Sequence, residues 1–338
     1  MDRPTVTKKA TAPKQGWAFW EHLADKAIAG EPPTREEALA VLQADDDELL
    51  PILHAAYRVR RHYYGKRVRL NMIINAKSGL CPEDCGYCSQ SIVSKAPIAK
   101  YPMLSKEVLV EGARKATELK AGTYCIVASG RGPTDRELET VIEAVKEIKA
   151  ELGLTVCACL GILTEEQARK LKEAGVDRYN HNLNTSEGHY ANIATTHTYA
   201  DRVATLRNVI KAGISPCSGC ILGMGESPED VVEMAFAVRE LDIDSIPINF
   251  LHAIPGTPLE HLNELTPVYC LKAVALFRFV NPTKEIRVAG GREVHLRTLQ
   301  PLLLYAANSI FIGDYLTTEG QAPSADYQML EDLGFEIA

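Results

Sequence analysis

The stretch RVRLNMIINAKSGLCPEDCGYC, residues 67–88, runs from a short apolar segment directly into three closely spaced cysteines. Its first part, Val68–Asn75, has the length and composition of a buried strand. Similar short apolar runs recur along the chain, and an amphipathic stretch follows each of them. This alternation is typical of parallel βα units.

Eight apolar runs qualify as strands of one parallel sheet. They are Val68–Asn75, Thr123–Ser129, Thr155–Leu160, Arg178–Leu183, Ser215–Leu222, Ser245–Leu251, Lys284–Val288 and Ser309–Gly313. An open doubly wound sheet alternates in the same way. The count of eight favours an α/β fold of the closed (β/α)8 TIM-type barrel class.

The chain divides into three parts. Residues 1–16 carry Pro, Thr and Lys without hydrophobic periodicity, which predicts a disordered N-terminal tail. Residues 17–66 have a helical pattern, with Thr34 as a candidate N-cap, and predict an N-terminal helical extension. Residues 67–338 hold the barrel.

The composition limits the compartment and the partners. A formal charge of −7 and a pI of about 5.8 give no field that attracts nucleic acid or an anionic membrane. The N-terminus lacks the apolar segment of a secretory signal, so we expect a cytoplasmic protein. Its nine cysteines are then core residues, metal ligands or reactive thiols rather than disulfides.

The decisive motif is the C-x3-C-x2-C triplet of Cys81, Cys85 and Cys88, just after the first predicted strand. Loops in this position hold the active sites of barrels. Three local thiolates suit an iron-sulfur cubane with one open iron, whereas a zinc site needs a distant fourth ligand. The motif therefore predicts a metal centre at the carboxyl end of the barrel.

Three further cysteines, Cys125, Cys157 and Cys217, fall in three different predicted strands. A lone strand cysteine is usually core packing, but three that point inward could converge inside a barrel. Cys159 shares a strand face with Cys157 and is an extra or alternative candidate ligand. Small packing residues are the alternative for Cys159 and Cys220, and we expect Cys270 in the core.

The triplet, with Tyr87 before its last cysteine, resembles the signature of the radical S-adenosylmethionine (SAM) superfamily. The resemblance implies a 4Fe-4S cluster on the three cysteines, with SAM bound to the open iron. Reductive cleavage of SAM would give a 5′-deoxyadenosyl radical that abstracts hydrogen from an unactivated carbon. No catalytic acid or base is then expected.

The ordered set CPEDCGYCSQ, YNHNLNTS, CSGCILGMGE, GTPL and IRVAGGRE is similar to the biotin synthase family. The resemblance implies an auxiliary 2Fe-2S cluster on Cys125, Cys157, Cys217 and Arg287, which donates the sulfur inserted into dethiobiotin. From the residues alone, Arg287 could equally pair with a cluster's negative charge or with a substrate carboxylate.

Two glycine-containing segments are candidate cofactor contacts. In the superfamily, the segment like GCILGMGE lies against the adenine of SAM, which implies contacts from Ile221 and Tyr87. The SGRG segment could hold the methionine end through Ser129 and Gly130. A simple turn before a helix explains each segment as well.

Asparagines alternate along YNHNLN, so a strand would place Asn180, Asn182 and Asn184 on one face. Amides offer donors and acceptors that match a ureido ring. The resemblance implies that Asn182 and Asn249 contact dethiobiotin and that Asn184 contacts the SAM ribose. His181 should point to the opposite face and be structural.

The family resemblance also implies partners. These are a flavodoxin or ferredoxin reductant, iron-sulfur assembly proteins and a second copy in a homodimer. Two other functions remain open at this point: a radical SAM enzyme acting on a different small molecule, and a noncatalytic iron-sulfur or zinc-binding scaffold.

Overall fold

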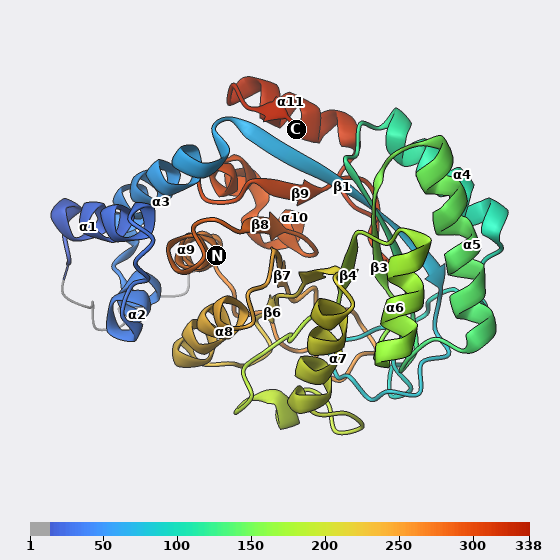
Figure 1. The fold of residues 1–338 in the computed structure, drawn as a ribbon. Helices are drawn as coiled ribbons and strands as arrows, with labels where there is room; N and C mark the ends of the chain where they lie inside the picture. Colours follow the sequence, from blue (N-terminus) through green and yellow to red (C-terminus); the bar gives the residue numbers. More distant parts are fainter. Residues whose placement is uncertain (1–13) are drawn as a thin grey trace, which may run out of the picture.

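Parallel strands form a closed ring in the centre of the molecule, and helices surround it (Figure 1). The computed structural model describes residues 14–338. Residues 1–13 of the predicted tail therefore lie outside the described residues. The strands are β1 (Arg67–Lys77), β2 (Thr123–Ala128), β3 (Thr155–Cys159), β4 (Arg178–Asn180), β5 (Ser215–Cys217), β6 (Cys220–Leu222), β7 (Ser245–Phe250), β8 (Glu285–Val288) and β9 (Ser309–Phe311). β9 pairs back onto β1, which closes the predicted (β/α)8 barrel.

The fifth and fourth strands differ from their predictions. The run predicted as one strand is split into β5 and β6, because the amides of Ser218 and Gly219 bond to the Ser245 carbonyl and the Asn182 side chain instead of continuing the ladder. β4 ends at Asn180, three residues earlier than predicted. A short strand, β10 (Glu336–Ile337), pairs with the start of β1 and was not predicted.

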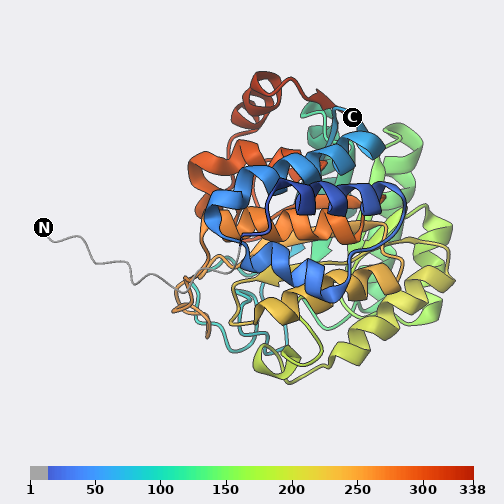
Figure 2. The same cartoon turned by 90° about the vertical axis from the view of Figure 1, so that its left-hand side faces the viewer.

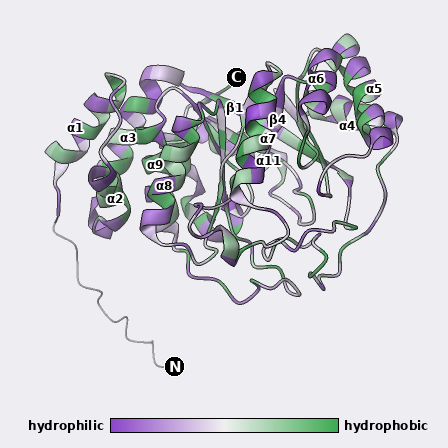
Figure 3. Ribbon diagram, turned by 60° about the horizontal axis from the view of Figure 1, so that its bottom comes forward, coloured by the Kyte–Doolittle hydropathy of each residue, from purple (hydrophilic) through white to green (hydrophobic). Residues whose placement is uncertain are grey.

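The outer helices lie between and after the strands along the chain. They are α4 (Lys106–Glu118), α5 (Asp135–Glu151), α6 (Glu165–Ala174), α7 (Tyr199–Lys211), α8 (Pro228–Glu240), α9 (Pro267–Val280), α10 (Arg292–Leu296) and α11 (Pro323–Asp332). Reciprocal capping boxes start α5, α6, α7 and α8, at Thr134, Thr164, Thr198 and Ser227. These helices carry hydrophobic and hydrophilic residues on different sides, and long loops gather at one end of the barrel (Figure 3).

Three N-terminal helices cover α9. They are α1 (Trp17–Ile28), α2 (Arg35–Gln43) and α3 (Leu49–Tyr64), and Figure 2 shows them lying across that helix. Residues 270–280 of α9 are buried in consequence, including two cations. Lys272 donates to the Ala44 carbonyl and Asp46, and Arg278 donates to three carbonyls and the Asn308 amide oxygen. Each buried charge therefore has partners, as burial requires.

Gly219, between β5 and β6, tests how tightly the barrel is packed there. A Cβ at this position would lie far inside the van der Waals contact distance of the Pro247 carbonyl oxygen on β7. We expect Gly219→Ala to lower the free energy of unfolding by roughly 1–3 kcal/mol, because the two strands must separate. Denaturant unfolding measures this. The control is Gly188→Ala, where nothing lies within 4 Å of the added carbon; equal effects would contradict the packing.

Candidate active site

A cavity of about 400 Å³ lies at the carboxyl ends of the barrel strands. Loops after β1, β2, β4 and β9 and the inner faces of the strands form its wall. Almost all of the candidate residues line it: Cys81, Cys85, Tyr87, Cys88, Cys125, Ser129, Gly130, Cys157, Asn182, Asn184, Ile221, Asn249 and Arg287. The remaining candidate, Cys217, contacts Cys157 through its thiol.

The loop cysteines are held by backbone donors. Amides of Glu83 and Gly130 point at the Cys81 sulfur, and those of Gln90 and Ser91 point at the sulfur of Cys88. Burial raises the pKa of the free Cys88 thiol to about 12 and that of Cys81 above its usual range. A metal ligand must be a thiolate, and amide donors stabilise that form. The loop therefore suits an iron-sulfur cluster.

The strand cysteines meet inside the barrel. Cys125 and Cys157 are direct partners in the β2–β3 register. The Cys157 thiol contacts the thiols of both Cys125 and Cys217, and all three side chains are at most 4% exposed. Asn180 donates to the Cys217 sulfur at 3.3 Å. Three buried thiols that meet at Cys157 fit a small metal-sulfur centre.

Arg287 lies beside these thiols on β8 and is 1% exposed. It donates to Glu285 at 2.6 Å through Nη2 and to Ser309 at 3.3 Å through Nε. Burial alone would lower its pKa, but the Glu285 carboxylate and the neighbouring thiols raise it above the ordinary value. Nη1 takes part in neither bond.

The side-chain spacing differs from that of a single-ion site. Within residues 14–338, no three His, Cys, Asp or Glu side chains are grouped so that they could share one metal ion. A cluster spreads its thiolates more widely, because they bind different iron atoms. The donor set is therefore compatible with clusters.

The leftover cysteines separate into two kinds. Cys159 lines the cavity on the same face of β3 as Cys157. Burial raises the pKa of the Cys159 thiol, and the nearby Cys217 thiol raises it further. Cys220 and Cys270 lie in the hydrophobic layer between strands and helices, both nearly or fully buried. Cys159 thus has the placement of a candidate ligand, and the other two are packing residues.

The candidate SAM contacts form one corner of the cavity. Tyr87 and Ile221 pack against the same small apolar cluster as Cys85 and Met224. Asn184 donates to the Tyr87 hydroxyl at 2.7 Å and adopts a left-handed φ of 72°, which asparagine tolerates better than most residues.

Ser129 and Gly130 follow β2 at the same end. The Ser129 hydroxyl donates to the Gly79 carbonyl, so its side chain ties the loop after β2 to the cysteine loop. Both residues line the cavity.

The side-chain amides of Asn182 and Asn249 already make hydrogen bonds within the protein. The Asn182 oxygen accepts from Asn180 at 3.0 Å and from the Gly219 amide at 3.1 Å, while none of the described residues accepts from its NH2 group. Asn249 donates to the Cys220 carbonyl and accepts from the Gly290 amide, both at 3.0 Å. The NH2 group of Asn182 is therefore free to donate into the cavity, whereas that of Asn249 already donates to the protein.

The prediction for His181 was wrong. It was expected on the face opposite the asparagines, but β4 ends at Asn180 and the strand alternation stops there. His181 lines the same cavity, and its Nε2 has no partner among the described side chains. Burial, followed by the charge of Arg202, lowers the pKa of His181, which favours the neutral ring.

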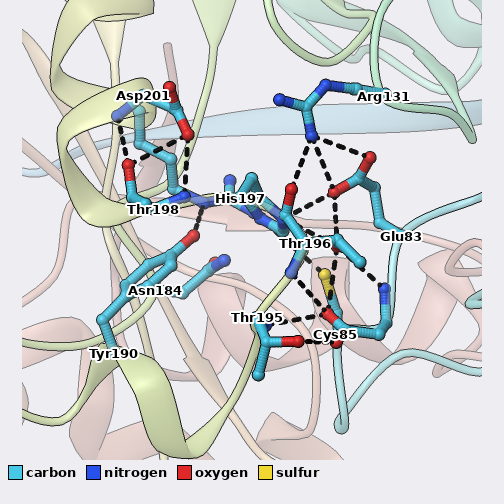
Figure 4. A network of polar contacts seen from close by, with 12 residues as sticks. Glu83, Cys85, Arg131, Asn184, Tyr190, Thr195, Thr196, His197, Thr198 and Asp201 are labelled. Carbon is cyan, nitrogen blue, oxygen red and sulfur yellow. Dashed lines mark hydrogen bonds and ion pairs between the residues drawn. The ribbon is translucent and has the colours of Figure 1, made fainter.

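Sequence reasoning missed a polar group that joins the cysteine loop to α7. Glu83, inside the triplet, accepts from Thr196 at 2.6 Å and lies 2.7 Å from His197 (Figure 4). His197 in turn lies 2.7 Å from Arg202, which lines the cavity. The position of Glu83 within the motif was a usable signal. For α7, only the folded structure shows which helical positions face the loop.

Comparisons with known proteins match this arrangement. Residues 77–238 match the radical SAM superfamily, and residues 247–336 match the biotin and thiamin synthesis associated domain. A biotin synthase from Geobacillus kaustophilus is 67% identical over 320 residues, covering 95% of this chain and 96% of that protein. One from Bacillus subtilis is 62% identical over 318 residues, covering 94% and 95%. The chain belongs to the biotin synthase family.

Solved structures resemble the fold of this biotin synthase family member. Methylornithine synthase has a TM-score of 0.82 at 21% identity, covering 94% of this chain and 97% of that one. The FeFe-hydrogenase maturase HydG from Carboxydothermus hydrogenoformans has a TM-score of 0.79 at 19% identity, covering 94% and 79%. At such identities the likeness concerns the fold alone.

Glu285 tests the electrostatics beneath the strand thiols of this family member. Its carboxylate pairs with Arg178 at 2.8 Å as well as with Arg287, and it is 6% exposed. We expect Glu285→Gln to lower the free energy of unfolding by about 3 kcal/mol, because two buried guanidinium groups lose their counter-charge. Denaturant unfolding of the cluster-free chain measures this.

The control is Glu240→Gln, whose side chain is 73% exposed in its ion pair. It should change the stability by no more than about 0.5 kcal/mol. A Glu285→Gln chain as stable as the parent would contradict the assigned pairing.

Proposed function

We propose that this chain is a sulfurtransferase that converts dethiobiotin to biotin with SAM as cofactor. The observation that carries the proposal is the meeting of two cysteine trios at one cavity, one from a loop and one from three strands. Near full-length similarity to curated biotin synthases supports the same conclusion.

The residues fit both clusters of the family. Cys81, Cys85 and Cys88 would hold a 4Fe-4S cluster, with amide donors on two of the sulfurs. Cys125, Cys157, Cys217 and Arg287 would hold a 2Fe-2S cluster. When bound, the first cluster supplies the electron for SAM cleavage and the second supplies the sulfur atom.

The chain's own residues orient SAM. Tyr87 and Ile221 offer an apolar surface for the adenine, and Asn184 is fixed by its bond to Tyr87 beside the ribose position. Ser129 and Gly130 border the methionine end. Arg202 has five N–H donors and three protein partners, so two donors remain for a carboxylate on the cavity side.

Dethiobiotin would lie deeper, between SAM and the strand thiols. Asn182 directs its free NH2 group to the ureido carbonyl, and Asn249 lines the same cavity. Val127, Ala289 and Phe311 form an apolar lining around Cys125 and Cys157. These side chains exclude water from the carbon atoms that must lose hydrogen, and no titrating side chain is needed there.

We extend the proposal to organisation and partners. Residues 17–66 act as a helical extension that covers α9, and residues 67–338 form the catalytic barrel. The protein works in the cytoplasm as a homodimer. It receives electrons from a flavodoxin or ferredoxin, and iron-sulfur assembly proteins load its clusters.

Dethiobiotin should stimulate SAM cleavage by the anaerobically reconstituted protein, because bound dethiobiotin fills the rest of the cavity and so favours cleavage of the bound SAM. Cys88→Ala should abolish cleavage, since it removes one of three thiolates. The control is Cys270→Ala, a core cysteine remote from the cavity, which should retain cleavage. Chromatography of 5′-deoxyadenosine and biotin measures both.

Absence of stimulation by dethiobiotin would assign the chain to another radical SAM reaction. Full activity of Cys88→Ala would favour the noncatalytic scaffold. Growth of a biotin-requiring strain carrying this chain distinguishes the proposed activity from that of a superfamily relative.

Asn182→Ala should raise the KM for dethiobiotin about 10-fold, because one hydrogen bond to the ureido group is lost. The KM for SAM should change much less. Asn208→Ala, on the outer side of the barrel, is the matched control; its amide donates only to the Leu163 carbonyl. Equal KM values for the two variants would remove Asn182 from the substrate site.

A further inference from the structure

Three side chains form a chain of polar contacts from the cysteine loop to the cavity wall. Glu83 lies between Cys81 and Cys85 and is 6% exposed, and His197, before α7, is 5% exposed. Arg202, one turn into α7, lines the cavity. The Nδ1 atom of His197 lies 2.7 Å from Glu83, and its Nε2 lies 2.7 Å from Nη2 of Arg202.

The chemistry of the three groups fixes the tautomer of His197. A guanidinium can only donate hydrogen bonds, so Nε2 must accept from Arg202 and carries no proton. A carboxylate can only accept, so Nδ1 must carry the proton and donate to Glu83. A doubly protonated ring would turn an N–H toward a guanidinium N–H. The neutral Nδ1–H tautomer is the form that satisfies both contacts.

Two further hydrogen bonds hold the Arg202 guanidinium in place. Its Nε donates to the Tyr190 hydroxyl, and Nη1 donates to the Asn182 carbonyl at 2.9 Å. The Tyr190 ring lies edge-on to His197, with centroids 5.9 Å apart. The imidazole is therefore the connection between this guanidinium and the cysteine loop.

We propose that His197 is a positioning residue, which holds Arg202 at a fixed place relative to the cysteine loop and so orients the carboxylate of SAM. The inference rests on the proposed function. It adds a role for a residue that acts through Arg202.

A second set of contacts anchors the cysteine loop without Arg202. The anchoring of the loop can therefore be tested separately from the positioning of Arg202. Thr196 also bonds to Glu83 and to Asp84, at 2.6 and 3.0 Å, and Arg131 pairs with Glu83 at 3.2 Å. These contacts hold the loop but do not reach Arg202. The Thr196 hydroxyl also lies 3.4 Å from Nδ1 of His197. A variant of Thr196 thus removes the loop anchor and this longer contact, and leaves the 2.7 Å contacts of the imidazole with Glu83 and Arg202.

The first experiment needs no cluster. Two-bond proton–nitrogen NMR of the cluster-free chain, labelled with 15N-histidine, reports the tautomer of each ring, and His197→Phe assigns the signal. We expect the Nδ1–H tautomer for His197, which is the minor form of free histidine. An Nε2–H or doubly protonated ring would overturn the proposal.

The second experiment uses the reconstituted enzyme and three variants. His197→Phe keeps the ring volume and should raise the KM for SAM about 10-fold, with a smaller change in kcat. His197→Gln restores one acceptor and one donor and should recover most of the affinity. Thr196→Val should have a smaller effect than His197→Phe.

Thermal unfolding and iron content show whether each variant is folded and loaded. Equal loss in the phenylalanine and glutamine variants, or an equal effect of Thr196→Val, would overturn the positioning role. A parent chain that fails to cleave SAM would refute the proposed function, while the tautomer measurement would still test the bridge on its own.

Discussion

The parallel register between neighbouring barrel strands is the constraint on which the site depends. β2 and β3 pair so that Cys125 lies directly opposite Cys157, and inward-pointing side chains of neighbouring strands then share one interior. The pairing of β8 with β9 places Arg287 opposite Ser309, and the pairing of β9 with β1 closes the ring. A shift of one residue in any of these pairings would turn a thiol or the guanidinium outward into the helices.

Two buried carboxylates organise the charged groups beside the cavity. Glu285 joins Arg178 and Arg287 below the strand thiols, and Glu83 joins the cysteine loop to His197 above them. Glu285 holds two guanidinium groups directly, whereas Glu83 pairs with Arg131 and reaches Arg202 through the neutral imidazole of His197. In an environment of low dielectric constant an unpaired charge is costly, so these contacts matter for stability. This arrangement gives each cysteine trio a fixed positive neighbour, which suits centres built from thiolates and sulfide.

The sequence was sufficient to predict the barrel and the end of the barrel at which the cavity lies, because strand runs and cysteine spacing are local patterns. It failed where tertiary contacts end a strand. β4 stops at Asn180, so alternation placed His181 on the wrong face, and Gly219 splits the fifth strand against Pro247. It also missed His197 and Arg202, because a helical pattern does not tell which positions will face a loop more than a hundred residues earlier in the chain. The family resemblance, rather than the residues alone, supplied Arg287.

The central claim is that six thiolates hold two different iron-sulfur centres at one cavity and that one centre gives up sulfur. Mössbauer spectroscopy of the anaerobically reconstituted, iron-57-labelled protein, before and after a single turnover, tests it most directly. The account predicts 4Fe-4S and 2Fe-2S signals at first, and loss of the 2Fe-2S signal in proportion to the biotin formed. A single type of cluster, or an auxiliary signal unchanged after biotin has formed, would contradict it.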